Sequence, residues 1–164
     1  MVRVKKSVHR RSESKSLTKV RHPLFRGIPT HSPSLWQAYL LTERASRVGF
    51  DWPSVVGVLK KLDEEVKELK EAVSSQNRRR MREEFGDLLF VLVNVARFLR
   101  INPEAALRGT LKKFKTRFNY VETSLRKKGK TFRQSSLTEM DRLWEEAKRR
   151  SEVPRSRAAG HLIL

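Results

Sequence analysis

The chain contains no cysteine. This absence excludes a disulfide framework, a thiolate zinc site and a cysteine nucleophile. The sequence has only four histidines, His9, His22, His31 and His161, and all lie in the terminal segments or at their edge, so a histidine-rich transition-metal site is not expected. Carboxylates must therefore supply the ligands for any bound metal.

Long hydrophobic segments are also missing. The longest apolar run covers residues 88–93, whereas a membrane-spanning helix needs roughly 20 apolar residues. The first residues do not show the apolar stretch of a secretory signal. The sequence therefore predicts a cytoplasmic protein that does not interact with membranes.

Acidic residues are scarce relative to basic ones, with 37 Lys and Arg against 18 Asp and Glu. The excess is uneven, because residues 1–30 hold nine basic residues against one acid and residues 31–123 hold seventeen against twelve. A basic segment poor in apolar residues cannot offset its ordering entropy. We expect a disordered basic tail over residues 1–23, one domain over 24–150 and a loose tail over 151–164. A transit peptide is the less favoured interpretation of the first segment.

No alternation typical of β-strands is present, and apolar residues instead recur at helical spacing. Start and stop signals such as Pro33, Gly49, Asn77, Asn102 and the pair of Ser136 with Glu139 delimit the segments. The pattern predicts an all-α bundle of about five helices, at about residues 32–48, 51–73, 77–100, 102–129 and 136–150. In this prediction, Asp51 caps the second helix.

Apolar positions indicate how these helices pack. Residues 88–99 are apolar nearly all round the third helix, which therefore should be the central element. The fourth helix has an apolar stripe, expected in the core, at Leu107, Leu111, Phe114, Phe118, Val121 and Leu125. Because the third helix has more apolar surface than one bundle covers, we expect a homodimer.

Two pairs of acidic residues recur at the same spacing. Glu65 and Glu68 fall on one flank of the second helix beside its apolar stripe, and Glu84 and Asp87 repeat this arrangement on the third. Carboxylates gathered near an apolar interior need a compensating cation, and Mg2+ prefers oxygen ligands. A solvated charged face remains the alternative, since Glu64 has lysines at helical spacing.

Basic and aromatic residues of the last two helices form a second candidate group. Lys113 and Arg117 are four residues apart beside an apolar stripe, as Trp144 and Lys148 are on the fifth helix. Such cations suit phosphate, and an indole ring suits a nucleobase. The alternatives are ordinary surface cations and a core tryptophan.

Four stretches together carry a family resemblance. They read RVGFDWP, KLDEEVKELKEA, EEFGDLLFVLVNVARFLRINPEAALRGTLKKFKTRFNYVE and LTEMDRLWEEAK. This order of EExxE followed by ExxD resembles the MazG family of nucleoside triphosphate pyrophosphohydrolases, and most of all the second, catalytic module of its tandem two-module members. Here a basic segment precedes the matching region, so either a stand-alone module or part of a split or truncated chain would fit.

The resemblance implies roles for individual residues. Its metal ligands for Mg2+, with Mn2+ as a substitute, would be Glu65, Glu68, Glu84 and Asp87, and Glu64 completes the EExxE pattern. Asn94, Lys113, Arg117, Trp144 and Lys148 would bind the substrate. The family also implies a helical dimer.

Together these features predict an enzyme that hydrolyses a nucleoside triphosphate to the monophosphate and pyrophosphate, as part of nucleotide-pool house-cleaning. Glu64 or Glu65 would accept the proton of the attacking water. The alternative is a non-enzymatic basic module that binds nucleic acid or an acidic partner. Weak nucleic-acid contact through the basic tail is compatible with either function.

Overall fold

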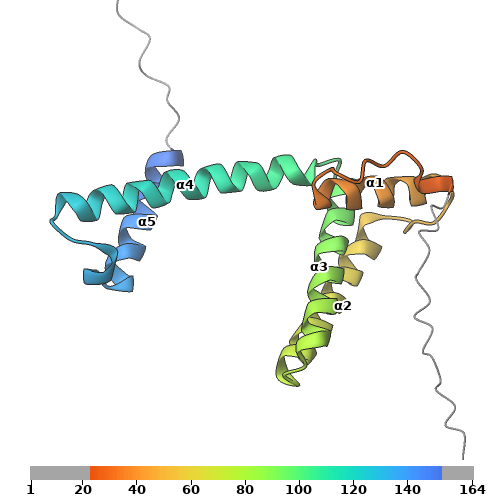
Figure 1. Ribbon diagram of the computed structural model, residues 1–164, viewed down its shortest axis with the longest axis horizontal. Helices are drawn as coiled ribbons and strands as arrows, with labels where there is room; N and C mark the ends of the chain where they lie inside the picture. The colour runs from red at the N-terminus through yellow and green to blue at the C-terminus, as the bar shows by residue number, and fades with distance from the viewer. Residues whose placement is uncertain (1–22, 153–164) are drawn as a thin grey trace, which may run out of the picture.

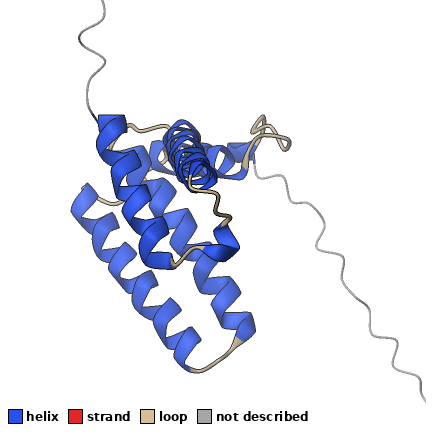
Figure 2. Ribbon diagram, turned by 90° about the vertical axis from the view of Figure 1, so that its left-hand side faces the viewer, coloured by secondary structure: helices blue, strands red, loops and turns tan. Residues whose placement is uncertain are grey.

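The computed structural model describes residues 23–152, which form five α-helices and two short 3-10 helices and contain no strand. Figure 2 shows this all-helical composition, which confirms the predicted fold class. The α-helices are α1 (Ser34–Arg47), α2 (Val55–Ser74), α3 (Arg78–Phe98), α4 (Pro103–Lys127) and α5 (Leu137–Glu152), and the 3-10 helices are η1 (Pro23–Phe25) and η2 (Phe132–Gln134). None of these helices has the length and apolar character that crossing a bilayer requires. Nearly all of the two predicted tails lies outside the described residues.

Three helix starts follow the capping signals of the sequence. The side chain of Asn77 accepts hydrogen bonds from the backbone N–H groups of Arg79 and Arg80. Asn102 caps α4 in the same way through Ala105, and the Ser136 hydroxyl accepts from the backbone of α5. Each bond satisfies a donor that a helix would otherwise leave unpaired.

Two predicted boundaries are wrong. Helix α1 begins at Ser34, and Pro33 is its N-cap and not its first residue. Helix α2 begins at Val55 after its N-cap Ser54, three residues later than predicted. Asp51 is not its cap, because the Asp51 carboxylate accepts a hydrogen bond from Nη2 of Arg97 at 2.5 Å.

The helices form two separate groups, as Figure 1 shows. Helices α2 and α3 make a hairpin, and α1 packs against α3. Helix α4 leads away from this group and carries α5 against its far end. Each group has its own small core, with Val58, Ala72, Val91 and Val93 in the first and Val121, Leu125 and Leu143 in the second.

Much of the predicted core remains exposed in this arrangement. Only Val121 and Leu125 of the α4 stripe are buried, whereas its other four members, Leu107, Leu111, Phe114 and Phe118, are 44–53% exposed. On α3, the side chains of Phe85, Leu89 and Leu92 are also about half exposed. The prediction that the whole α4 stripe lies in the core is therefore wrong for the single chain, because α4 extends beyond the hairpin that would have to cover it.

Candidate metal and nucleotide site

Three carboxylates meet between α2 and α3. One oxygen from each of Glu65, Glu84 and Asp87 lies within 4.8 Å of the other two. Glu65 is only 4% exposed, Glu84 is half-buried and Asp87 is exposed. The cluster therefore extends from the hairpin interior to its surface, where a substrate can reach it.

Helical spacing explains how α2 places Glu65 in this position. The buried residues of α2 are Val58, Glu65 and Ala72, which are separated by seven positions and so lie on one line of the helix. That line faces α3, since these two helices make the most extensive contact in the fold. An acid in the middle of an apolar line is costly to bury unless its charge is balanced.

Lys61 supplies this balance in the structure. Its Nζ lies 2.8 Å from Oε1 of Glu65 and 2.8 Å from Oε1 of Glu64. Hydrogen bonds to Glu64 and then to Glu65 raise the pKa of Lys61. On α3, Nε of Arg80 lies 3.5 Å from Oε1 of Glu84. Neither cation was predicted from the sequence, although both precede their acids by four residues, the spacing of a helical ion pair.

Two further predicted acids lie at the margin of the cluster. Glu68 is half-buried one turn after Glu65, but it does not belong to the group of three. The side chain of Glu64 is 56% exposed and points toward Lys61 and solvent. Glu64 is therefore accessible to water, and Glu68 lies on the same helix as Glu65 but outside the group of three.

Asn94 lies farther along α3 and is 2% exposed. Its Oδ1 accepts a hydrogen bond from Nε of Arg97 at 2.8 Å. Asn94 follows Asp87 by seven positions, which is about 10.5 Å along the helix and about 20° around it. Both residues therefore lie on nearly the same side of α3.

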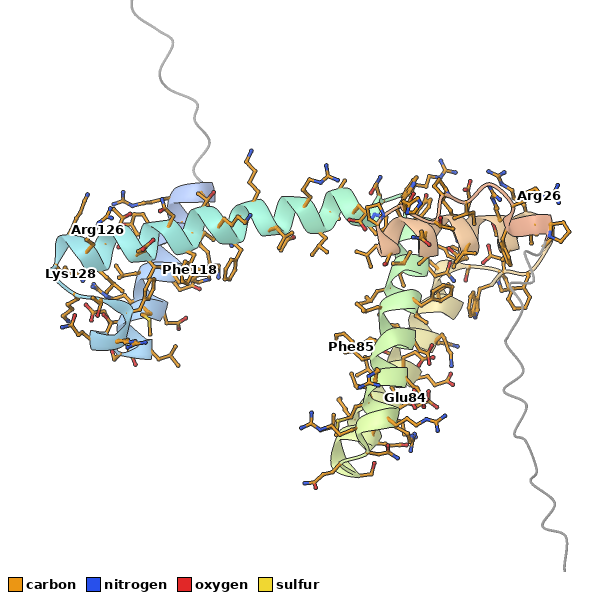
Figure 3. The ribbon with its side chains drawn as sticks, viewed as in Figure 1. Arg26, Glu84, Phe85, Phe118, Arg126 and Lys128 are labelled. Atoms are coloured by element: carbon orange, nitrogen blue, oxygen red, sulfur yellow. The ribbon has the colours of Figure 1, made fainter. Side chains whose placement is uncertain are left out.

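The remaining predicted residues lie at the other end of the molecule. Figure 3 shows Glu84 on the hairpin and Phe118 on the distant α4–α5 group, to which Lys113, Arg117, Trp144 and Lys148 also belong. Nη2 of Arg117 is 3.4 Å from the Ser151 hydroxyl, and Lys148 pairs with Glu145 at 2.8 Å. A single chain therefore does not bring these residues to the carboxylates.

Trp144 and Lys113 differ in their surroundings within this group. The Trp144 ring is half-buried and packs against Phe114 with 5.3 Å between the ring centroids, so it forms part of the α4–α5 core. Lys113 is exposed on α4. The site residues of this end thus combine a ring fixed by packing with a cation that faces solvent.

The donor set fits a hard divalent cation. All three clustered residues offer carboxylate oxygens, the ligands that Mg2+ and Mn2+ prefer. Because one of these acids is buried, a bound cation would replace the compensation that Lys61 provides. The fold and this cluster define an all-α protein with a cluster of carboxylates, of the kind that binds divalent metal ions, between two antiparallel helices.

Comparisons with known proteins agree with this class. Residues 56–122 match the family model of the MazG nucleotide pyrophosphohydrolase domain. The chain is 46% identical over 116 residues to the nucleoside triphosphate pyrophosphohydrolase/pyrophosphatase MazG of Thermotoga maritima, covering 71% of this chain and 44% of that protein. It is 36% identical over 135 residues to the nucleoside triphosphate pyrophosphohydrolase of Escherichia coli K12, covering 80% of this chain and 51% of that protein.

Residues 56–122 therefore form a MazG nucleotide pyrophosphohydrolase domain, and the chain is similar to members of the MazG family. The matched region contains all five predicted acids and both α4 cations. The chain spans about half the length of these two relatives. A shorter match, 52% identical over 68 residues, covers 14% of the uncharacterized protein YabN of Bacillus subtilis.

Proposed function

We propose that this chain hydrolyses nucleoside triphosphates and deoxynucleoside triphosphates to the monophosphate and pyrophosphate in the presence of Mg2+. The observation that carries this proposal is the group of three carboxylates whose oxygens lie within 4.8 Å on two packed helices. The MazG domain at residues 56–122 and the similarity to proteins named nucleoside triphosphate pyrophosphohydrolases support the choice of reaction.

Glu65, Glu84 and Asp87 would hold the cation, and Glu68 would complete the set. A bound Mg2+ would supply charge neutralisation for the triphosphate and a lower pKa for water near the α-phosphorus. Glu65 would then no longer depend on Lys61 for compensation. The Lys61 ammonium would be available to bind a phosphate oxygen at the edge of the site.

Glu64 is the carboxylate best placed to act as general base. Its side chain is 56% exposed, so it can meet a water molecule, whereas Glu65 is buried in the group of three. Glu64 would take a proton from the water whose oxygen attacks the α-phosphorus. The bond from that phosphorus to the oxygen bridging to the β-phosphorus breaks, and pyrophosphate leaves with the bridging oxygen.

Lys113 and Arg117 would bind the leaving pyrophosphate, and Trp144 and Lys148 would lie near the nucleotide. Since one chain keeps them away from the carboxylates, we propose a homodimer in which the α4–α5 group of one protomer covers the hairpin of its partner. The three clustered carboxylates of the hairpin and the basic α4–α5 group have complementary charge. The half-exposed apolar faces of α3 and α4 would supply the buried contact area.

Figure 3 supports this arrangement, because Phe85 projects from the side of α3 that faces the α5 end of the molecule. Phe85 is 54% exposed. An aromatic side chain left half in water gains stabilisation when a second copy covers it. Light scattering coupled to size-exclusion chromatography tests this part of the proposal, and a clean monomer at micromolar concentration would contradict it.

The activity is tested by measuring pyrophosphate release from a panel of NTPs and dNTPs with Mg2+, with Mn2+ and with EDTA, while chromatography identifies the nucleotide product. We expect monophosphate and pyrophosphate only when a divalent cation is present. Including damaged and non-canonical nucleotides tests the house-cleaning role through the ranking of kcat/KM. No turnover on any nucleotide would refute the proposed function.

A further inference from the structure

A cavity of about 350 Å³ lies between α1, the α1–α2 connection and α3, and none of the site residues except Asn94 faces it. Its walls are mainly apolar and include four aromatic side chains, Phe25, Phe50, Trp52 and Phe90. The polar lining residues are Thr42, Asp51, Asn94 and Arg97. Aromatic walls combined with a few fixed polar groups are typical of pockets for small organic ligands.

The polar residues of this pocket hold one another in place. Nη2 of Arg97 donates to Oδ1 of Asp51, which also accepts from the backbone N–H of Trp52 at 2.9 Å. Nε of Arg97 donates to Oδ1 of Asn94. The second Asp51 oxygen and the Asn94 amide nitrogen make no hydrogen bond to the described part of the chain. The pocket thus offers one hydrogen-bond acceptor, from Asp51, and one hydrogen-bond donor, from Asn94. The rest of Asn94 is almost completely buried.

The position of this pocket relative to the carboxylates restricts what it can hold. Asn94 lies about 10.5 Å along α3 from Asp87 and on nearly the same side of the helix, and Phe90 lies between them in the sequence. A ligand with phosphates at Asp87 would therefore direct its other end toward the pocket. The Watson–Crick edge of a nucleobase presents both donors and acceptors, and its ring stacks on aromatic side chains.

We infer that this pocket binds the nucleobase of the triphosphate, with Phe90 and Trp52 contacting the ring and with Asp51 and Asn94 bonding its edge. The inference rests on the proposed function, because it takes the carboxylates as the phosphate end of the same ligand. Trp144, by contrast, already uses its ring in packing against Phe114. Base discrimination would then reside in the α1–α2 connection and α3.

The test compares a ligand that has both a nucleobase and a chain of three phosphates with a ligand that has the three phosphates alone. Binding of an α,β-imido nucleoside triphosphate and of inorganic tripolyphosphate is measured by calorimetry, with Mg2+ present, on the full chain. We expect Phe90→Ala and Asp51→Asn to weaken binding of the nucleotide about tenfold, the loss of one stacking or polar contact, without changing the affinity for tripolyphosphate. Leu99→Ala is the matched control, since this exposed residue at the end of α3 does not line the pocket.

Equal weakening of both ligands, or no weakening of either, would overturn the inference. A change of molecular mass in Phe90→Ala would overturn it as well, because it would identify the pocket as an interface between copies. Failure of the proposed function looks different: the wild-type chain would neither bind tripolyphosphate with Mg2+ nor release pyrophosphate. In that case, a nucleoside that quenches tryptophan fluorescence in the wild type but not in Trp52→Phe would still support the pocket, and the absence of such quenching would refute it.

Discussion

The ammonium group of Lys61 lies 2.8 Å from the buried carboxylate of Glu65. This ion pair occupies the place in the hairpin where a divalent cation would otherwise balance the acid. Lys61 therefore stabilises the metal-free protein, and its importance to stability should depend on whether metal is bound.

Replacing Lys61 by methionine tests this dependence. In EDTA we expect Lys61→Met to lower the free energy of unfolding by about 1–3 kcal/mol, because a buried carboxylate loses its partner. With saturating Mg2+ the loss should largely disappear, since a ligand that binds only the folded state stabilises it. Urea denaturation under both conditions measures the difference. Lys60→Met, an exposed neighbour, should change stability by less than about 0.5 kcal/mol under either condition.

Neutralising single carboxylates tests the metal site itself. Asp87→Asn and Glu68→Gln should each reduce pyrophosphate release by at least about 100-fold, because each removes a charged oxygen ligand. Circular dichroism should remain that of the wild type. Glu71→Gln, on the exposed side of α2, is the control, and this variant should keep the wild-type activity. Wild-type turnover by Asp87→Asn would refute the site.

Mixing two inactive variants tests whether each site is shared between protomers. Asp87→Asn lacks a hairpin acid and Arg117→Ala lacks an α4 cation. If one site takes its acids from one chain and its cations from the other, a mixed dimer contains one intact site. Random exchange of protomers would then restore about a quarter of the wild-type activity. No restoration after verified subunit exchange would show that each chain supplies a whole site.

Acid should weaken the contact between α4–η2 and α5. Hydrogen bonds from Lys130 and then Lys128 lower the pKa of Glu139 below its ordinary value of about 4.5. A depressed carboxyl pKa contributes stability that is present above the ordinary value and is lost as pH falls through the folded value. Denaturation curves from pH 7 to pH 3 should therefore depend less on pH in Glu139→Gln than in the wild type. Glu122→Gln, an exposed change on α4, should behave like the wild type.

A methyl group added at Gly57 should displace Trp52. A Cβ at this position would lie 2.7 Å from Cδ1 of Trp52, which is closer than two carbon atoms normally approach. We expect Gly57→Ala to alter tryptophan fluorescence and to raise the KM for nucleotides more than it lowers kcat. Gly109→Ala is the control, because its Cβ would meet nothing within 4 Å and alanine favours the helix by about 1 kcal/mol.

Sequence signals predicted the local features of the fold well. Asn77, Asn102 and Ser136 act on backbone groups two or three residues away, so the identity of the capping residue was sufficient. The start of α2 was not predictable in this way, because Asp51 bonds to Arg97, 46 residues along the chain. Periodicity identified the residues that share a face of α4, but it could not tell how far α4 extends beyond the hairpin.

In the candidate site, too, local features were predictable from the sequence and long-range arrangements were not. Glu65, Glu84 and Asp87 were predicted to converge because short connections bring consecutive helices together, and the structure brings their oxygens within 4.8 Å. The balancing role of Lys61 was missed, since three other lysines, Lys60, Lys67 and Lys148, also precede an acid at helical spacing. The distance between the carboxylates and Arg117 depends on the direction in which α4 leaves α3, which no residue pattern specified.

Helix α4 sets the spacing between the two halves of the molecule. Its 25 residues extend about 37 Å at 1.5 Å per residue, and its exposed middle makes few contacts that would resist a change in length. Inserting one residue there would turn the distal half by about 100° and direct Arg117 to a different side, although both small cores would stay intact. In the proposed homodimer, the length of this helix would be restricted by alignment with the second copy and not by folding. Relatives with the same reaction should then tolerate substitutions along it far better than insertions.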